Sequence, residues 1–369
     1  MSPKLSIYGP LQARAVETYL KLELDAVFTE IERVDDDTRR GIADARDGGI
    51  GVYACTWAFK APHGASGCGI VNAEGEREIW ARAGCPNNPT IREASLAWAH
   101  HVLVDLEIDG LVLDGVRFPS PGSGLRAFLS CFCSHCFRKA QEWGVDLERV
   151  RKCLSDRDRF GDQTIGLMAS RGTFPDRVED EDFRNWVSFR CNSILEHVEA
   201  FVETAKEADP STRTGAALFA PSLSLIVGQD YRRLCQVLDF LQPMVYERGT
   251  GIACINFELA QLFGEAFSGV RGKSLKVLYE ALGYSDRNPL NPTDLKNLGL
   301  DSEVVEKEIR RAKVLTRQGR ARLTPILFAL HKKGDEVNRL VETALSCGVG
   351  EIVLFAYEEG INDHWINRR

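Results

Sequence analysis

Residues 109–119 read DGLVLDGVRFP, an apolar run that ends in an acid, Asp114, with a base, Arg117, three residues later. Short apolar runs bounded by turn residues are typical of strands buried on both faces of a parallel sheet. A charged side chain is costly inside such a strand, so we expect Asp114 to be solvated at the strand end or paired, most simply with Arg117. The stretch therefore predicts a buried strand that delivers an acid to its carboxyl end.

Similar apolar runs recur along the chain and alternate with helical patterns. They lie at 5–8, 26–29, 50–55, 111–116, 214–219, 240–246, 323–330 and 352–357. Apolar residues at helical spacing occupy Pro89–Asp105 and 182–208 between them. Eight strands alternating with helices are the number that closes a barrel, so we expect an α/β protein with a (β/α)8 TIM barrel, formed by residues 1–369 as a single domain. A ninth run, 275–280, has apolar spacing that favours a helix over a strand.

The connections after the predicted strands differ greatly in length. Segments 58–89, 119–183 and 248–301 are long, whereas the others are short. In this fold, long loops after the strands build the active face. The sequence therefore places the candidate site at the carboxyl ends of the strands.

Composition narrows the classes of partner and compartment. The net charge of −7 comes with no basic stripe, and no segment approaches the ~20 apolar residues of a membrane span, so we expect neither nucleic acid nor membrane as a partner. The eleven cysteines are an odd number, and the N-terminal residues lack the pattern of a signal peptide. We therefore expect the protein in a reducing cytoplasm. A homo-oligomer is compatible with this composition. No dinucleotide, nucleoside triphosphate or serine-hydrolase motif occurs.

Three cysteines, Cys131, Cys133 and Cys136, form a C-x-C-x-x-C run shortly after the fourth predicted strand. Three thiolates so spaced can bind one Zn²⁺ from one side and leave one ligand to come from elsewhere. Cys85 is the natural candidate, because the loops after strands three and four are neighbours in a barrel. His135 lies inside the run and could replace one cysteine. The alternative is that these are free, buried thiols.

The same residues carry a family resemblance. A cysteine followed by an Asn/Pro-rich turn at 85–89 and a helix, then C-x-C-x-x-C after the next strand, resembles the four-cysteine structural zinc cluster of the family 42 glycoside hydrolases, the β-galactosidase barrels. The run opens a helix with Phe137-Arg138-Lys139, which also resembles related hypothetical glycosyl hydrolase barrels. The resemblance implies structural zinc and a carbohydrate ligand. Family 42 enzymes carry an Asn-Glu pair at the end of strand four, which is absent here; an Asp there is similar to the nucleophile position of several α-glycosidase barrels.

A glycosidase of the usual mechanism needs two carboxyl groups that flank the scissile bond. We interpret Asp114 as the nucleophile, Arg117 as the cation that holds it ionised, and Glu247, which ends the sixth predicted run, as the acid/base of a retaining enzyme. The alternative for Glu247 is a salt bridge to Arg248 or Arg117. If the pair has been lost, the barrel would bind carbohydrate without hydrolysing it. A reactive centre at the thiols is a third hypothesis, which four cysteine ligands closing a zinc shell would exclude.

Sugar rings pack on flat aromatic faces, and their hydroxyls are held by charged or polar groups. Such side chains follow most predicted strands, although any one of them alone could be a packed core residue. The candidates for substrate binding are Tyr8, Trp57, Phe118, Tyr246, His331 and Tyr357, with Glu30 and Glu358 as reserve carboxylates at the ends of strands two and eight. Their joint placement predicts a carbohydrate-binding face.

Overall fold

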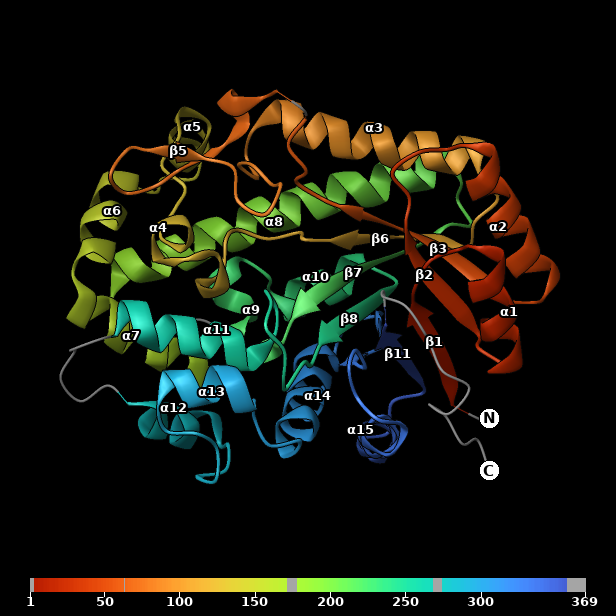
Figure 1. Cartoon of the computed structure of the whole chain (residues 1–369). Helices are drawn as coiled ribbons and strands as arrows, with labels where there is room; N and C mark the ends of the chain where they lie inside the picture. The colour runs from red at the N-terminus through yellow and green to blue at the C-terminus, as the bar shows by residue number, and fades with distance from the viewer. Residues whose placement is uncertain (1–2, 63, 171–177, 268–273, 357–369) are drawn as a thin grey trace.

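The computed structural model describes residues 3–62, 64–170, 178–267 and 274–356. Its central element is a closed ring of parallel strands (Figure 1). The strands are β1 (Lys4–Tyr8), β2 (Ala26–Glu30), β3 (Gly51–Trp57), β6 (Gly110–Asp114), β7 (Arg213–Phe219), β8 (Phe240–Met244), β9 (Arg322–Leu323), β10 (Ile326–Phe328) and β11 (Glu351–Phe355). Because β9 and β10 are two pieces of one barrel strand, and β10 pairs with both β8 and β11, the ring has eight positions and closes. The predicted (β/α)8 fold is confirmed.

Aromatic rings fill the inside of the barrel. The ring of Phe240 on β8 lies 5.6 Å from that of Tyr53 on β3 and 6.2 Å from that of Phe28 on β2. These strands are not neighbours of β8, so the rings meet in the interior. Gly215 makes room for them, because a Cβ there would lie 2.1 Å from the Phe240 ring. This packed layer closes the barrel below the carboxyl ends of its strands.

Most predicted strands shift by a residue or two at their ends, and three of them differ in a way that matters for the site. The fourth ends at Asp114, where Gly115 takes a φ of 59° and turns the chain. The sixth ends at Met244. The seventh is interrupted at Pro325, which has no N–H to donate to a ladder. The run at 275–280 lies in helix α12 (Leu275–Leu282), as its spacing predicts.

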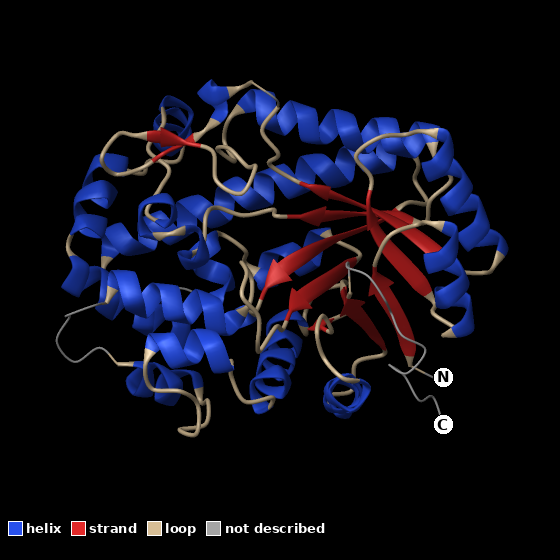
Figure 2. Ribbon diagram, in the orientation of Figure 1, coloured by secondary structure: helices blue, strands red, loops and turns tan. Residues whose placement is uncertain are grey.

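One set of helices surrounds the barrel, and a second set of elements, most of them shorter, stands beyond its carboxyl end. The surrounding helices are α1 (Ala13–Lys21), α2 (Asp36–Asp47), α3 (Pro89–Asp105), α8 (Glu181–Ala208), α10 (Tyr231–Val237), α14 (Glu303–Thr316) and α15 (Gly334–Ser346). The shorter elements are β4 (Ile70–Val71), β5 (Arg77–Glu78), α4 (Leu125–Phe128), α5 (Ser134–Glu142), α6 (Leu147–Ser155), α7 (Arg157–Ala169), α9 (Pro221–Ser224), α11 (Ile255–Gln261), α12 and α13 (Pro292–Leu298). Most of the latter gather on the left in Figure 2, where the arrows of β6 and β7 point. The long segments of the sequence therefore cover the expected active face.

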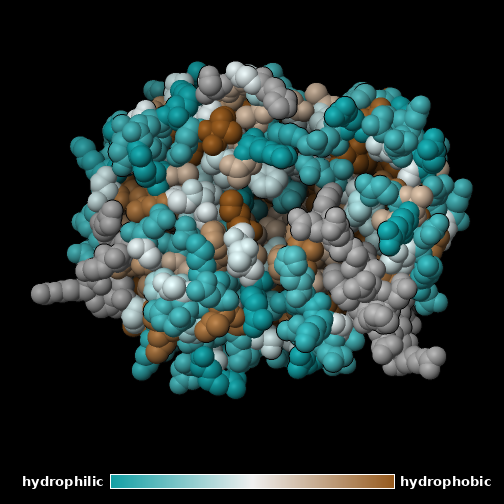
Figure 3. Space-filling model, viewed as in Figure 1, coloured by the Kyte–Doolittle hydropathy of each residue, from teal (hydrophilic) through white to brown (hydrophobic). Residues whose placement is uncertain are grey.

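The face of the molecule shown in Figure 3 is mainly hydrophilic. On the face shown in Figure 3, apolar side chains are scattered among polar ones, and the surface is hollowed near its middle. Among the described helices, none combines the length and the apolar character needed to cross a bilayer.

Candidate active site

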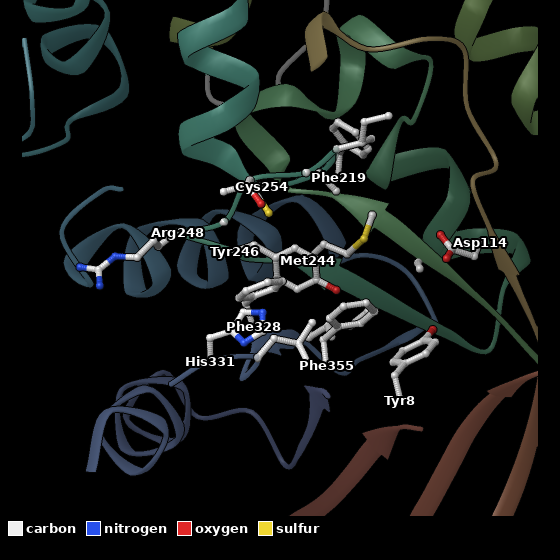
Figure 4. A pocket seen from close by; sticks show the side chains of 18 of the residues that line it. Tyr8, Asp114, Phe219, Met244, Tyr246, Arg248, Cys254, Phe328, His331 and Phe355 are labelled. Atoms are coloured by element: carbon white, nitrogen blue, oxygen red, sulfur yellow. The ribbon is translucent and has the colours of Figure 1, made fainter. Parts of the chain in front are cut away.

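A cavity of about 590 Å³ opens at the carboxyl ends of the barrel strands. Its wall combines aromatic rings with charged groups, and the loops after β6, β8 and β10 complete it. The lining side chains that matter below are Tyr8, Trp57, Asp114, Arg117, Phe219, Tyr246, Arg248, Lys296, Phe328, His331, Lys332, Glu336 and Phe355. Figure 4 shows Asp114 and Tyr8 on one side of the view and Arg248 and His331 on the other, with the aromatic group between them. Asp114 and Arg248 thus lie on opposite sides of the cavity.

Asp114 stands at the end of β6 and is half-buried. Its Oδ1 accepts a hydrogen bond of 2.6 Å from the backbone N–H of Gly115. No ion pair joins it to Arg117 in the described part of the chain, so the expected direct contact is not formed. Burial raises the pKa of Asp114, and the hydrogen bond from Gly115 and the more distant charge of Arg117 only partly oppose that effect. The site therefore favours the protonated form more than a solvated aspartate does.

Arg117 is almost fully buried, at 2% exposed, because aromatic rings enclose its guanidinium. The guanidinium carbon lies 4.6 Å from the ring of Trp80 on one side and 4.6 Å from that of Phe219 on the other. One nitrogen, Nη1, donates a hydrogen bond of 3.0 Å to the carbonyl of Phe118. Burial lowers the pKa of Arg117 to about 10, still well above neutrality, so the group remains a cation.

Glu258 on α11 ties two loops of the cavity wall together. Its Oε1 accepts hydrogen bonds from Ser120 Oγ and from the Ala253 backbone N–H, both at 2.9 Å, and its Oε2 accepts one of 2.6 Å from the Gly122 N–H. Gly122 is needed because a Cβ there would lie 2.6 Å from the carboxylate. Burial raises the pKa of Glu258, while the charge of Arg117 lowers it. Sequence reasoning missed this residue, whose position inside a helix carries no sign of such a role.

Glu247 does not line the cavity. It is 5% exposed, and its Oε1 accepts a hydrogen bond of 2.7 Å from the ammonium of Lys332, which does line the cavity. Its Oε2 is enclosed and has no hydrogen-bond partner within the part of the chain that the structure describes. The partner is thus neither Arg248 nor Arg117, the two cations that the sequence suggested. Glu247 is connected to the cavity through Lys332.

The predicted sugar-binding residues divide into three groups. Tyr8, Trp57, Tyr246 and His331 line the cavity together. Phe118 is fully buried in the core, where its ring lies 6.3 Å from that of Phe189. Glu30 is exposed and lines a separate surface groove beside α2. Residues 357 and 358, which include the predicted Tyr357 and Glu358, lie outside the described residues.

Tyr8 connects the cavity to the interior of the barrel. Its hydroxyl donates a hydrogen bond of 2.6 Å to Oε1 of Gln242 on β8. Burial raises the pKa of Tyr8 well above its ordinary value, with smaller contributions from Cys55 and Asp114. Burial has the same effect on Tyr246, again with a contribution from Asp114. Both phenols are therefore neutral donors near the carboxyl group of Asp114.

Several lining residues were missed in the sequence. Phe219 ends a predicted run, so the rule that selected Tyr8 would have found it too. Phe328 and Phe355 end their strands two residues before the predicted runs 323–330 and 352–357 do, so the same rule passed over them. The rings of Phe328 and Phe355 stack at 5.8 Å, and both pack on Tyr246. Lys296 lies in helix α13 and Lys332 in the loop after β10, and no local pattern distinguishes either of them as a cavity residue.

Four cysteines form a second centre next to the barrel. The sulfur atoms of Cys85, Cys131, Cys133 and Cys136 all lie within 4.8 Å of one another, and all four residues are buried. The distances from Cys85 Sγ to the sulfurs of Cys136 and Cys133 are both 3.5 Å. Tetrahedral Zn–S bonds of about 2.3 Å place sulfurs about 3.8 Å apart, so the thiols fit a single metal ion. His135 does not belong to this described group.

Polar groups around the cluster favour negative charge on sulfur. The N–H of Val71 points at Cys131 Sγ at 3.3 Å, and the side chain of Asn87 donates to Cys136 Sγ at 3.4 Å. Hydrogen bonds from Cys131 and the other cluster thiols lower the pKa of Cys133, while burial raises the pKa of Cys85. Such donors are the usual surroundings of metal-bound thiolates. The cluster joins the segments after β3 and β6, as the sequence predicts.

No protein-family model and no curated protein matches this chain. Solved structures do. The PgaB (BpsB) glycoside hydrolase domain from Bordetella bronchiseptica has a TM-score of 0.62 at 11% identity, covering 96% of this chain and 94% of that one. A β-galactosidase from the haloarchaeon Halorubrum lacusprofundi has a TM-score of 0.58 at 14% identity, covering 99% and 55%. A catalytic mutant of Gan42B, a GH42 β-galactosidase from G. stearothermophilus, has 0.56 at 12%, covering 98% and 52%.

This chain therefore spans nearly all of the PgaB domain and about half the length of the β-galactosidases. The resemblance to GH42 barrels, inferred above from the cysteines, is present at the level of the fold. At these identities the likeness shows that the chain has the barrel fold of these glycoside hydrolases.

Proposed function

We propose that this protein is a glycoside hydrolase in which Asp114 is the proton donor. The observation that carries the proposal is the position of Asp114, a carboxyl group at the end of a barrel strand in the wall of an aromatic cavity. Strand ends at this face are where barrel enzymes keep their catalytic groups. The fold shared with glycoside hydrolases supports the reaction class.

The roles we propose are the reverse of those expected from the sequence. A proton donor needs a raised pKa, and burial raises that of Asp114, which has no cation in direct contact. The other carboxylate, Glu247, forms an ion pair of 2.7 Å with the ammonium of Lys332. Two carboxyl groups in opposite environments are the arrangement that divides acid and base work. In this proposal Lys332 moves aside to admit the sugar to Glu247.

Glu336, the second carboxylate that lines the cavity, is a poorer candidate. Its Oε2 accepts a hydrogen bond of 3.0 Å from the Lys333 N–H at the start of α15, and that bond lowers the pKa of Glu336. The carboxylate thus already caps a helix. Glu336 provides a matched control for experiments on Asp114.

The test is the turnover of aryl glycosides with different leaving groups. We expect Asp114→Asn to reduce kcat about 10²–10⁴-fold on phenyl glycosides, and much less on dinitrophenyl glycosides, whose departure needs little protonation. Glu247→Gln should reduce turnover of both, and Glu336→Gln should leave both nearly unchanged. Equal losses on both leaving groups for Asp114→Asn would overturn its role as the proton donor.

A non-hydrolytic carbohydrate-binding barrel is the second candidate, and one observation favours it. Glu247 is occupied by Lys332 and does not reach the cavity wall, so the second carboxylate is covered. If a broad panel of aryl glycosides is not turned over by the wild type, while a sugar raises its Tm, the binding function is the correct one.

We propose further that the four cysteines hold a structural zinc ion. Cys85, Cys131, Cys133 and Cys136 supply a complete set of sulfur ligands, which leaves no open position for a substrate or a reactive water. When bound, the ion would supply a cross-link between the segments after β3 and β6. The thiols are therefore assigned to stability and not to catalysis.

A further inference from the structure

We propose that the cavity is specific for sugars that carry a carboxylate, and that Arg117 binds this carboxylate. The inference rests on the proposed carbohydrate-binding function of the cavity and names the class of its ligand. It starts from a buried cation whose hydrogen-bonding capacity is mostly unused.

The guanidinium of Arg117 makes one hydrogen bond in the described structure, from Nη1 to the Phe118 carbonyl. Glu258 and Asp114 act on its charge from a distance, but neither forms an ion pair with it. The fully enclosed atoms that lack a partner include Nε of Arg190 but no nitrogen of Arg117. Arg117 lines the cavity, so a ligand bound there can supply partners for its unbonded nitrogens.

Arg190 shows what a purely structural arginine looks like in this fold. It is fully buried and stacks on Trp186 at 4.1 Å, much as Arg117 stacks on Trp80. Its two terminal nitrogens, however, donate to three backbone carbonyls, those of Ile226, Phe128 and Ser130. Arg190 does not line the cavity. The difference leaves Arg117 as a buried arginine that lacks partners on the side of the cavity.

The surroundings of Arg117 fit a carboxylate better than a phosphate. With Nη1 used by the Phe118 carbonyl, the free edge consists of Nε and Nη2, which can hold the two oxygens of one carboxylate side by side. The rings of Trp80 and Phe219 enclose the group and offer no further donors to a dianion. A single guanidinium edge between apolar walls therefore matches a monoanion.

The position of Arg117 also fits the proposed chemistry at Asp114. In a hexuronide the carboxylate on C5 and the glycosidic oxygen on C1 flank the same ring oxygen. Asp114 ends β6, Arg117 follows it by three residues, and both line the cavity. This short segment can thus contact the leaving oxygen and the carboxylate of the same sugar.

Two further cations, on the opposite side of the cavity from Asp114, strengthen its preference for anionic sugars. Arg248 and Lys296 are exposed and line the cavity, and among the described lining residues Glu336 is the acid that opposes them there. Basic side chains near an entrance raise the local concentration of anions. We expect this contribution to fall with added salt, while the contact with buried Arg117 should persist.

The test is calorimetric binding of free monosaccharides to the intact protein, which does not depend on turnover. Glucuronate and galacturonate should bind about 10–100-fold more tightly than glucose and galactose, as expected for a charge-assisted, two-bond contact. Arg117→Lys and Arg117→Gln should reduce this ratio to below about 3-fold. Glucose 6-phosphate should bind no better than glucose; tighter binding than glucuronate would overturn the assignment to carboxylates.

Arg190→Lys is the matched control, because it alters a buried, stacked arginine that does not line the cavity. It should lower the Tm and leave the ratio of glucuronate to glucose affinity unchanged. Because each ratio is measured on one sample, partial unfolding of a variant cancels. Equal affinities of the wild type for uronic and neutral sugars would overturn the inference even if neutral aryl glycosides are hydrolysed. Conversely, selective binding of uronic acids without hydrolysis of any glycoside would support it while refuting the proposed hydrolase.

Discussion

The ammonium of Lys332 lies 2.7 Å from Oε1 of Glu247, and each side chain is only 7% exposed. This pair joins the loop after β10 to the loop after β8 at the wall of the cavity. Removing one partner of a buried pair leaves an uncompensated charge, which is far more costly than losing both partners. The free energy of unfolding of single and double variants at these two positions therefore measures what the pair contributes to stability, separately from any effect on catalysis.

We expect Lys332→Met to lower the free energy of unfolding by about 3 kcal/mol, because the Glu247 carboxylate is left buried and unpaired. Adding Glu247→Gln should restore part of that loss. Urea denaturation of the two single variants and the double variant measures the coupling. Additive effects of the two substitutions would show that the pair does not contribute to stability.

The metal proposal predicts about one zinc ion per chain in the purified protein. Stripping the ion with a chelator should lower the Tm and make the cluster thiols reactive, and Cys136→Ser should do the same. Cys191, which is buried but lies outside the cluster, provides the control, since Cys191→Ser should keep the metal. Elemental analysis together with thiol titration checks this. A metal-free protein that is unaffected by chelation would refute the zinc site.

The stability contribution of Asp114 should depend on pH in a defined direction. Its pKa in the folded state is raised, so the contribution is fully present below the unfolded pKa of about 3.9 and is lost as pH rises through the folded value. Asp114→Asn should therefore stabilise the protein relative to wild type near neutral pH, and that gain should shrink towards about pH 4.

Asp209 is the opposite case and serves as the control for this measurement. Hydrogen bonds from Ser211 lower its pKa, so its contribution is present above the unfolded pKa and is lost as pH falls. Asp209→Asn should therefore be destabilising near neutral pH and approach wild type in acid. Denaturation curves at several pH values record both trends. The same trend for both variants would contradict the assigned environment of Asp114.

Phe118 and Trp57 were both predicted to bind sugar, but their substitution should have different effects. Phe118 is fully buried in the core, so Phe118→Ala should lower the free energy of unfolding by about 3–5 kcal/mol and leave the ratio of sugar affinities intact. Trp57 is half-buried and lines the cavity, so Trp57→Ala should weaken sugar binding with a smaller loss of stability. Parallel calorimetry and denaturation would separate the two effects. A binding defect in Phe118→Ala at full folding would contradict its placement.

The strand ends were predictable because a buried parallel strand is a local signal. Asp114 and Tyr8 were found in this way, since each is a polar group at the end of an apolar run. Phe118 was misleading, because the chain turns at Gly115 and carries the ring into the core instead of the cavity. The four cysteines were found because the order of barrel strands fixes which loops are neighbours.

The ion pairs could not be predicted because they depend on loops whose course is set by tertiary contacts. Lys332 reaches Glu247 from a turn in which His331 takes a φ of 60°, a conformation that no sequence pattern announces for a histidine. Arg117 illustrates the same limit. Its three-residue spacing from Asp114 suggested a pair, whereas the rings of Trp80 and Phe219, distant in sequence, hold its guanidinium elsewhere.

The carboxylate of Glu258 also governs how the cavity can change shape. It holds Gly122 on the loop after β6 and Ala253 on the loop after β8, so neither loop can swing outward without breaking buried hydrogen bonds. These two loops therefore move together as one rigid unit. On the opposing wall Lys332 is held by its buried ion pair with Glu247, so Leu330 and His331 are the residues to diversify there when a bulkier ligand is to be admitted.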